Sequence, residues 1–454
     1  MGKQWKGLII YFYNSYPLWQ RFSRKSIFYQ TFFYSIQKKM KIAVIAESIN
    51  VNDSSGSKVN VELIKNLSKI CSQVVVYHYT QIEIQIQGTQ CFNISENKFS
   101  LFFVLSRIQR YFTKFTGVSL HRPLENLFGF SFTFFSDTQS IKSQLPEVKN
   151  GGFDYVLTLS KGSSFRPHYA LLQYPELHSK WIAYVHDPFP FHFYPRPFTK
   201  VLPGYHQKED FFREMSERAR FIGFPSLLLS EWMGSFFPEM LIKRVIIPHQ
   251  ISENIQEAPI ELPGWQKGNF NILHAGNLLK ERPADGLITG FQKFLSKNPR
   301  YKVNARLFLI GPAQSHENKL GQYAAEIPEL KVLTNSLKFE HALYLQKEAT
   351  VNVILESKSE ISPFLPGKFP HCVLVDKPIL LLSPLYSETR RLLGKDYPYT
   401  AESDDMESIS EIFEHLYSRW EQNKDLSLDR PDLLEYVGVP YLAKLINHLP
   451  DSNV

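Results

Sequence analysis

Two successive series of short apolar segments constrain the fold of this chain more than any other feature of its sequence. The first series opens at residues 41–46 and the second at residues 270–274, and each continues as apolar runs separated by loops or by segments with helical spacing. Runs that are apolar throughout are typical of parallel strands buried on both faces. The alternation therefore predicts an α/β protein with two Rossmann-like domains in tandem, whose ligands bind beyond the carboxyl ends of the strands.

The two series are divided by residues 255–268, a segment rich in proline and glycine. We therefore predict an N-terminal domain at 40–255, a C-terminal domain at 256–430, and a helical segment at 431–454 that packs back on the N-terminal domain. Further strands are expected at 74–77, 155–159, 181–185, 220–224, 245–247, 305–310, 331–333, 351–355 and 378–382. Helices are expected over 59–70, 285–295 and 341–347.

The basic surplus of the chain is confined to its first residues. The net charge is +7, and residues 1–39 contain seven lysines and arginines and no acidic residue. The remaining residues carry 44 basic and 44 acidic side chains, which does not indicate a duplex-binding surface, and no nucleic-acid partner is expected. Because residues 1–39 are also rich in aromatic side chains, they resemble an interfacial anchor. The alternative is an upstream extension outside the fold, because Met40 stands directly before the first strand.

The cysteines and the lengths of the apolar runs indicate the cellular compartment in which the protein is expected. Cys71, Cys91 and Cys372 form an odd set without a close pair, which indicates neither a disulfide framework nor a cysteine zinc site and fits a reducing cytoplasm. No apolar run reaches the roughly 18 to 20 residues that cross a bilayer. Residues 98–136, rich in phenylalanine with interspersed cations, predict an amphipathic helical insertion. This insertion either attaches peripherally to the anionic inner face of the plasma membrane or packs on the core.

The loop after the strand at 270–274 is a candidate phosphate site. The chain lacks a Gly-x-Gly-x-x-Gly after either first strand, a phosphate loop and a His-Glu-x-x-His helix, which disfavours dinucleotide oxidoreductases, nucleotide triphosphatases and zinc proteases. Instead, Gly276, Asn277 and Arg282 precede the helix at 285–295. A glycine lets the backbone approach a phosphate, and helix N–H groups and a guanidinium bind its oxygens. The alternative is a turn with solvated charges.

A second cluster precedes the strand at 378–382. Gly367 and Lys368 open a helix, a geometry suited to neutralising one more phosphate charge, and His371 follows about one turn later. Taken alone, Lys368 is equally well explained as a surface lysine.

Together the two clusters resemble the GT-B glycosyltransferases, specifically the family 4-like enzymes, over about residues 40 to 450. The matching segments are the loop 276–283, the helix start 366–368 and the strand 377–380, with 154–160, 181–188 and 225–226 followed by 247–249 in the first half. The resemblance implies two Rossmann-like domains facing each other across a cleft. It also implies a nucleotide sugar, linked to uridine diphosphate, in the C-terminal domain, an acceptor in the N-terminal domain, and retention at the anomeric carbon.

The resemblance assigns roles to particular residues. The donor-binding set would be that of the two clusters: Gly276, Asn277, Arg282, Gly367, Lys368 and His371. His186 and Asp187 would be catalytic residues near the transferred sugar, while Ser160 and His168 would lie on the acceptor side. Neither a metal nor a cofactor is expected. For His168, His186 and His249 the alternative is a structural histidine at a strand end.

Two departures from the family pattern affect these assignments. The family commonly has two glutamates around the second cluster, where this chain has Pro363 and His371, and often an arginine where it has Asn277. Glu356 and Glu360 are either substitutes for a missing carboxylate or solvated loop acids.

The expected function is transfer of a sugar to a saccharide or lipid-linked acceptor in cell-surface polysaccharide or glycoconjugate synthesis, in the cytoplasm. One alternative, favoured by the lost glutamates, is a non-catalytic GT-B domain that binds a nucleotide sugar, a glycan or a protein partner. The other is a sugar-nucleotide epimerase of the same fold.

Overall fold

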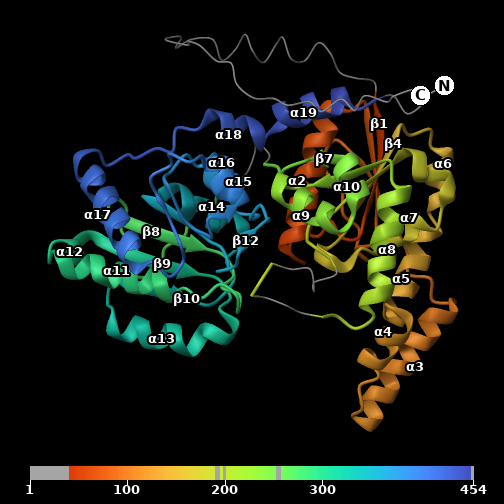
Figure 1. Ribbon diagram of the computed structural model, residues 1–454, viewed down its shortest axis with the longest axis horizontal. Coiled ribbons are helices and arrows are strands. Elements are labelled where there is room, and N and C mark those ends of the chain that lie inside the picture. The colour runs from red at the N-terminus through yellow and green to blue at the C-terminus, as the bar shows by residue number, and fades with distance from the viewer. Residues whose placement is uncertain (1–39, 190–194, 198–200, 252–256, 451–454) are drawn as a thin grey trace. The chain divides into compact units, whose positions relative to one another are not determined.

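The computed structural model describes residues 40–189, 195–197, 201–251 and 257–450 (Figure 1). The predicted extension at residues 1–39 lies outside the described residues, as do the first two residues of the predicted linker.

The first half of the described chain forms a seven-stranded sheet in which every neighbouring pair is parallel. Its spatial order is β3-β2-β1-β4-β5-β6-β7. The strands are β1 (Lys41–Ala46), β2 (Gln73–His78), β3 (Gln90–Asn93), β4 (Tyr155–Leu159), β5 (Trp181–Tyr184), β6 (Phe221–Phe224) and β7 (Arg244–Ile246). The chain order reverses between β1 and β4, and ligands of such sheets bind beyond the carboxyl ends of the strands at this point.

The second half forms a six-stranded parallel sheet with the order β10-β9-β8-β11-β13-β15. Its strands are β8 (Phe270–Ala275), β9 (Ala305–Ile310), β10 (Leu330–Leu333), β11 (Val351–Leu355), β13 (Ile379–Leu382) and β15 (Thr400–Ala401). A separate short pair joins β12 (Ile361–Ser362) to β14 (Tyr386–Ser387). Here the chain order reverses between β8 and β11, which confirms the predicted α/β class with two parallel-sheet domains.

Helices occupy the connections in both halves (Figure 1). In the first half they are α2 (Ser55–Ile70), α3 (Leu101–Thr116), α4 (His121–Phe128), α5 (Phe132–Lys142), α6 (Leu145–Asn150), α7 (Arg166–Leu172), α8 (Tyr205–Arg218), α9 (Leu227–Phe236) and α10 (Pro238–Ile242), with 3-10 turns at Gly162–Ser164 and Pro175–Lys180. In the second they are α11 (Asp285–Lys297), α12 (Tyr301–Asn304), α13 (Glu317–Glu326), α14 (Phe339–Glu348), α15 (Phe369–Leu374), α16 (Glu388–Leu393), α17 (Met406–Gln422), α18 (Pro431–Tyr436) and α19 (Val439–His448), with a 3-10 turn at Gln314–His316.

Helix α2 shows how the sequence sets local structure. The Ser54 side chain accepts a hydrogen bond from the Ser57 backbone N–H, which caps the first turn. Leu63 and Leu67 recur at helical spacing and are buried in the core against β1. Leu442 and Ile446 of α19 enter the same core, so the last described helix packs beside α2 (Figure 1).

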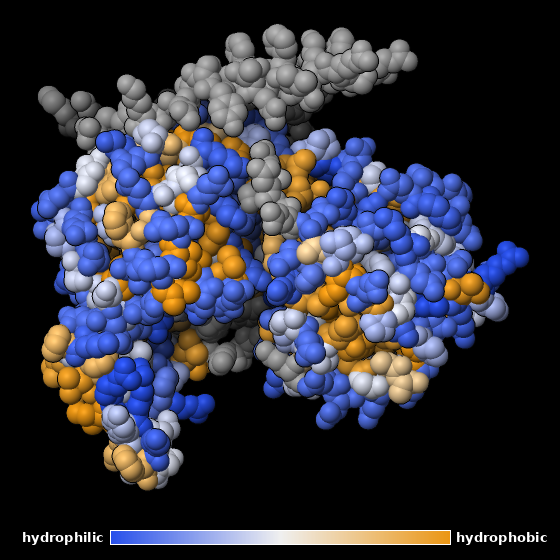
Figure 2. All heavy atoms as spheres, turned by 180° about the vertical axis from the view of Figure 1, so that it is seen from behind, coloured by the Kyte–Doolittle hydropathy of each residue, from blue (hydrophilic) through white to orange (hydrophobic). Residues whose placement is uncertain are grey.

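The predicted insertion at 98–136 is helical. It comprises α3, α4 and the first part of α5, and α3 packs along α5. Figure 2 shows apolar side chains along the outer edge of these helices. None of the described helices combines the length and the apolar character that spanning a membrane requires.

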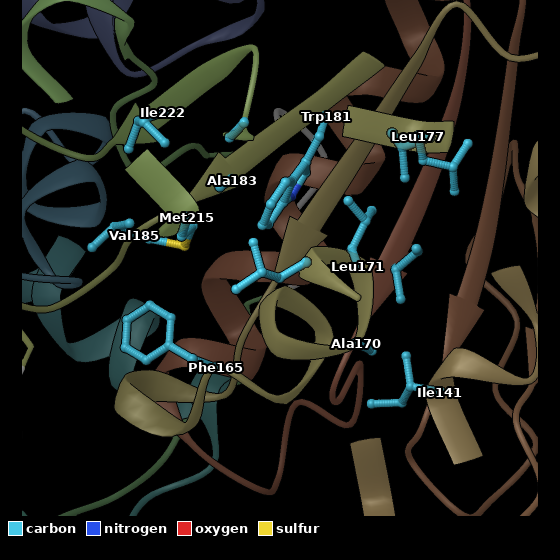
Figure 3. Close-up of a cluster of buried hydrophobic side chains, with 14 of the residues drawn as sticks. Ile141, Phe165, Ala170, Leu171, Leu177, Trp181, Ala183, Val185, Met215 and Ile222 are labelled. Atoms are coloured by element: carbon cyan, nitrogen blue, oxygen red, sulfur yellow. The ribbon is translucent and has the colours of Figure 1, made fainter. Parts of the chain in front are cut away.

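Both faces of the first sheet are buried, as the apolar strands require. Ile42 and Val44 of β1 contribute to one core, while Ala43 and Ile45 contribute to another. Figure 3 shows part of the second of these cores, where Trp181 of β5 lies among side chains from α7, α8 and β6. The sheet is therefore a rigid support for the loops at its carboxyl edge.

The predicted strands agree with the structure to within one or two residues at each end. Four of the described strands were not predicted: β3 and β15 of the two main sheets, and the two-residue strands β12 and β14. β3 reads Gln90–Asn93 with only one buried residue, and β15 has two residues at the sheet edge. Short strands at an edge lack the continuous apolar run that identifies a central strand.

Candidate functional site

The loops that follow β8 and β11 bring the two predicted clusters together. Gly276 follows β8, and Lys368 caps the N-terminus of α15, ninety-two positions later. A Cβ atom placed on Gly276 would lie 2.6 Å from the Lys368 Nζ, and the Gly276 φ of +151° is rare for residues with a side chain. Glycine is therefore required here by the close approach of the lysine as well as by the backbone.

The Lys368 ammonium group lies against His274 of β8, 3.3 Å from Nε2 and 3.4 Å from Nδ1. Burial and the Lys368 charge hold the pKa of His274 well below its ordinary value, so this imidazole is neutral. Burial in turn lowers the pKa of Lys368 to about 7. Lys368 is half-buried and forms no ion pair within the described part of the chain, which leaves its amino group suited to an incoming anion.

Arg282 acts electrostatically on four groups of the site. Its charge lowers the pKa of Asp187, His274, Glu356 and Lys368. The Arg282 Nε is buried and has no hydrogen-bond partner among the described residues. An unsatisfied buried donor is costly, and a phosphate oxygen is a ligand that would satisfy it.

Glu356 follows β11 directly. It is one of the two acids that could substitute for the glutamates of the family pattern. It is buried, and burial raises its pKa, which the hydroxyls of Thr389, Ser362 and Ser387 partly offset. Neither of its carboxylate oxygens has a well-formed hydrogen bond among the described residues. Glu360, by contrast, is exposed and forms an ion pair with Arg196 at 3.3 Å. Of the two acids weighed from the sequence, Glu356 is the one at the site.

His186 and Asp187 lie directly beyond β5, on the first sheet. The His186 ring packs edge-on against Tyr184 at 4.6 Å and contacts Asn60 of α2 through a hydrogen bond of 2.9 Å. Burial raises the pKa of Asp187 to about 6, and the charge of Arg282 opposes this rise. The Asp187 carboxyl group, at the edge of the first sheet, therefore interacts electrostatically with Arg282 of the donor cluster.

His168 and Ser160, the predicted acceptor-side residues, are both buried. The His168 side chain is fully buried between Phe165 and Trp181, and its Nε2 contacts the Tyr184 carbonyl oxygen at 3.0 Å. The Ser160 hydroxyl donates to the Gly162 carbonyl oxygen at 2.7 Å. Both side chains are enclosed by the protein, while the His168 Nδ1 has no hydrogen-bond partner among the described residues, and the acceptor-side role of the two residues stays a prediction.

The remaining predicted donor residues lie around these groups with different exposures. Asn277 is exposed, and Gly367 is half-buried; a Cβ atom placed on Gly367 would lie 3.8 Å from a Val59 methyl group. His371 packs edge-on against Phe339 at 4.8 Å, and burial lowers its pKa to about 4. The buried His249 ring lies 6.1 Å from His186, and its pKa is lowered to about 4 by burial and by His371.

Three site residues were missed from the sequence. Asn60 lies within an expected helix and His274 within an expected strand. The sequence signal that could have identified them is that each is a polar residue among apolar ones. Glu356 was considered but not selected, although its position directly after an apolar strand at the point of reversed strand order was a usable signal. Among the described residues, no cluster of three or more His, Cys, Asp or Glu side chains is arranged to hold a metal ion.

Two parallel-sheet domains with these switch-point loops define the class: the arrangement is the GT-B fold. Among particular proteins, the chain is similar to the Escherichia coli trehalose-6-phosphate structure bound with UDP-2-fluoro glucose (TM-score 0.57, 11% identity, 90% of this chain and 98% of that one). It is also similar to the N-terminal domain of Candida albicans trehalose-6-phosphate phosphatase (TM-score 0.57, 13% identity, 92% and 98%).

A third similar structure is the Burkholderia xenovorans α,α-trehalose-phosphate synthase (UDP-forming) in complex with glucose-6-phosphate (TM-score 0.55, 9% identity, 89% and 100%). These likenesses establish the fold across nearly the whole chain. No family model matches the sequence, and no curated protein matches it.

Proposed function

We propose that this protein is a glycosyltransferase that moves a sugar from a nucleotide diphosphate donor to an acceptor hydroxyl. The observation that carries the proposal is the pair of basic side chains Arg282 and Lys368, which both act on the titration of His274 and form no ion pair among the described residues, with Lys368 directly beside Gly276. This arrangement favours a diphosphate, because two partly buried basic groups and a close backbone approach match its charge and its oxygens.

In the proposed reaction the donor diphosphate lies against Gly276, Arg282 and Lys368. These cations stabilise the negative charge that develops as the bond from the anomeric carbon to the phosphate oxygen breaks. His186 and Asp187 approach from the first sheet, where a neutral imidazole and a carboxyl group with a raised pKa orient the sugar and the acceptor hydroxyl. Retention at the anomeric carbon is part of this proposal.

Uridine diphosphate is the proposed nucleotide, supported by similarity in fold to a structure bound with UDP-2-fluoro glucose and to UDP-forming synthases. The proposed acceptor is a saccharide or a lipid-linked saccharide of cell-surface polysaccharide or glycoconjugate synthesis, used in the cytoplasm. The helical insertion α3 to α5 in the acceptor-side half supports an acceptor attached to a lipid.

The test is a thermal-shift screen of the full chain against nucleotide sugars that differ in base and in sugar. Transfer assays with the stabilising donor would follow. We expect one uridine diphosphate sugar to raise the melting temperature and to be consumed only when an acceptor is present. Absence of stabilisation by every nucleotide sugar would contradict the proposed donor site.

A second candidate is a non-catalytic domain that binds a nucleotide sugar. The substitution of both family glutamates, by Pro363 and His371, favours it, since the Pro363 carbonyl oxygen instead accepts a hydrogen bond from Ser226. Tight binding of a donor without transfer to any saccharide acceptor would support this alternative.

A further inference from the structure

Helix α3 turns its apolar face away from the protein. On its packed face the Phe102 ring contacts Phe132 and Phe135 of α5 at 6.3 and 5.0 Å, and Ser106 is buried. On its other face stand large apolar side chains that are all exposed, from 41% at Phe112 to 83% at Phe115: Leu101, Val104, Ile108, Tyr111, Phe112 and Phe115.

These exposed residues form one continuous stripe. Their spacing of three, four, three, one and three residues places them on a single side of an α-helix, opposite Phe102 and Ser106. A surface helix of a globular protein normally directs such a stripe into the core. Phe99 and Val118, which stand just before and just after the helix, are also exposed and extend the apolar sequence beyond both of its ends.

The charges around this stripe are mainly positive. Residues 97–124 contain Lys98, Arg107, Arg110, Lys114 and Arg122 and no acidic residue. Arg107 lies 4.0 Å from the carboxylate of Glu96, and Arg110 donates a hydrogen bond to the Thr133 hydroxyl. Lys98, Lys114 and Arg122 are exposed. An apolar stripe bordered mainly by cations is complementary to a surface that has an apolar interior and a negatively charged boundary.

We propose that the stripe of α3, with its bordering cations, docks on an anionic lipid bilayer. The apolar surface is a convex helix face, and a bilayer accepts such a face without a matching groove. The cations then lie at the level of the lipid phosphates, where each adds to the attraction. This docking surface does not depend on the proposed transferase activity, although it would bring the acceptor-side half close to a lipid-linked acceptor.

The test compares full-length variants for binding to vesicles of phosphatidylcholine alone and of phosphatidylcholine with phosphatidylserine, at low and high salt. The stripe variant carries Val104→Ser, Ile108→Ser and Phe115→Ser. Its matched control carries Ile242→Ser, Val303→Ser and Leu385→Ser, which remove three other well-exposed apolar side chains from other surfaces. A charge variant carries Lys98→Gln, Lys114→Gln and Arg122→Gln. Equal melting temperatures establish that the variants are folded.

We expect the wild type and the control to bind anionic vesicles, the stripe variant to bind at least about tenfold more weakly, and the charge variant to lose the preference for anionic lipid. Equal binding by the wild type and the stripe variant would overturn the proposal, because residues 1–39 or another surface would then carry the affinity. So would failure of the wild type to bind. A wild-type dimer that the stripe variant converts to a monomer, without vesicle binding, would instead identify this face as a contact between copies of the chain.

Discussion

The Nε2 atom of His186 and the Oδ1 atom of Asn60 lie 2.9 Å apart, which joins the end of β5 to the buried face of α2. The Asn60 amide nitrogen donates to the Ser160 carbonyl oxygen at 3.0 Å, so its oxygen is the atom that faces His186. An amide oxygen only accepts, and His186 must therefore carry its proton on Nε2. Burial holds the pKa of His186 well below its ordinary value, so the ring is neutral and Nδ1 is a hydrogen-bond acceptor.

We predict that Asn60 positions His186 for sugar transfer. His186→Ala and Asn60→Leu should each lower turnover roughly 10- to 100-fold while leaving uridine diphosphate affinity nearly unchanged, because neither residue belongs to the cation cluster. The double variant should be no slower than either single variant, which steady-state kinetics and calorimetry would establish. Full turnover of the His186→Ala variant would contradict this prediction and would show that His186 has a structural role only.

The Asn60→Asp variant separates positioning from packing. A carboxylate beside Nε2 raises the pKa of His186, so the imidazole becomes charged at a higher pH than in the wild type. The acid limb of the pH–rate profile should therefore move to higher pH, which a purely structural role of Asn60 would not produce.

The fold could be predicted from the sequence further than the site could. Central parallel strands such as β4 and β8 carry a continuous apolar run, which is a local signal. Whether a polar residue at the end of such a strand faces a ligand or the core depends on packing that no local pattern shows. His168 was therefore assigned to the acceptor side although it is enclosed by the core, and Asn60, fully buried on α2, was missed.

The two cations of the donor cluster should contribute strongly to nucleotide binding. Arg282→Ala and Lys368→Ala are each predicted to weaken uridine diphosphate binding by about 1.5 to 3 kcal/mol, the usual contribution of a charge-assisted hydrogen bond. Isothermal titration calorimetry is the measurement, and Lys302→Ala, which removes an exposed cation from α12, is the control. Unchanged affinity in both site variants would remove the proposed diphosphate site.

Binding of the diphosphate should take up a proton through Lys368. The pKa of this lysine is lowered to about 7 by burial, and a bound diphosphate would raise it towards the ordinary lysine value of 10.5. Between these two values the free protein is largely deprotonated at Lys368 while the complex is protonated. Affinity should therefore fall by up to about tenfold for each pH unit above 7.

Calorimetry at about pH 8 in buffers of different ionisation enthalpy would measure this uptake, which should approach one proton per nucleotide. The Lys368→Met variant should show none. An equal uptake in the two proteins would mean that another group titrates.

The close approach of Gly276 to Lys368 gives a prediction that tests the geometry of the cluster itself. In Gly276→Ala the new methyl group would lie 2.6 Å from Nζ and 2.9 Å from Cε of Lys368, so the lysine must move, and the backbone φ of +151° adds strain. We expect the protein to fold and uridine diphosphate affinity to fall about tenfold, because the ammonium group is displaced from the diphosphate.

Gly321→Ala on α13, where a Cβ atom meets nothing within 4 Å, is the control and should leave affinity unchanged. If the loss acts through Lys368, Gly276→Ala should cost much less affinity in a Lys368→Ala background than in the wild type, whereas full additivity would show that the glycine contacts the nucleotide independently.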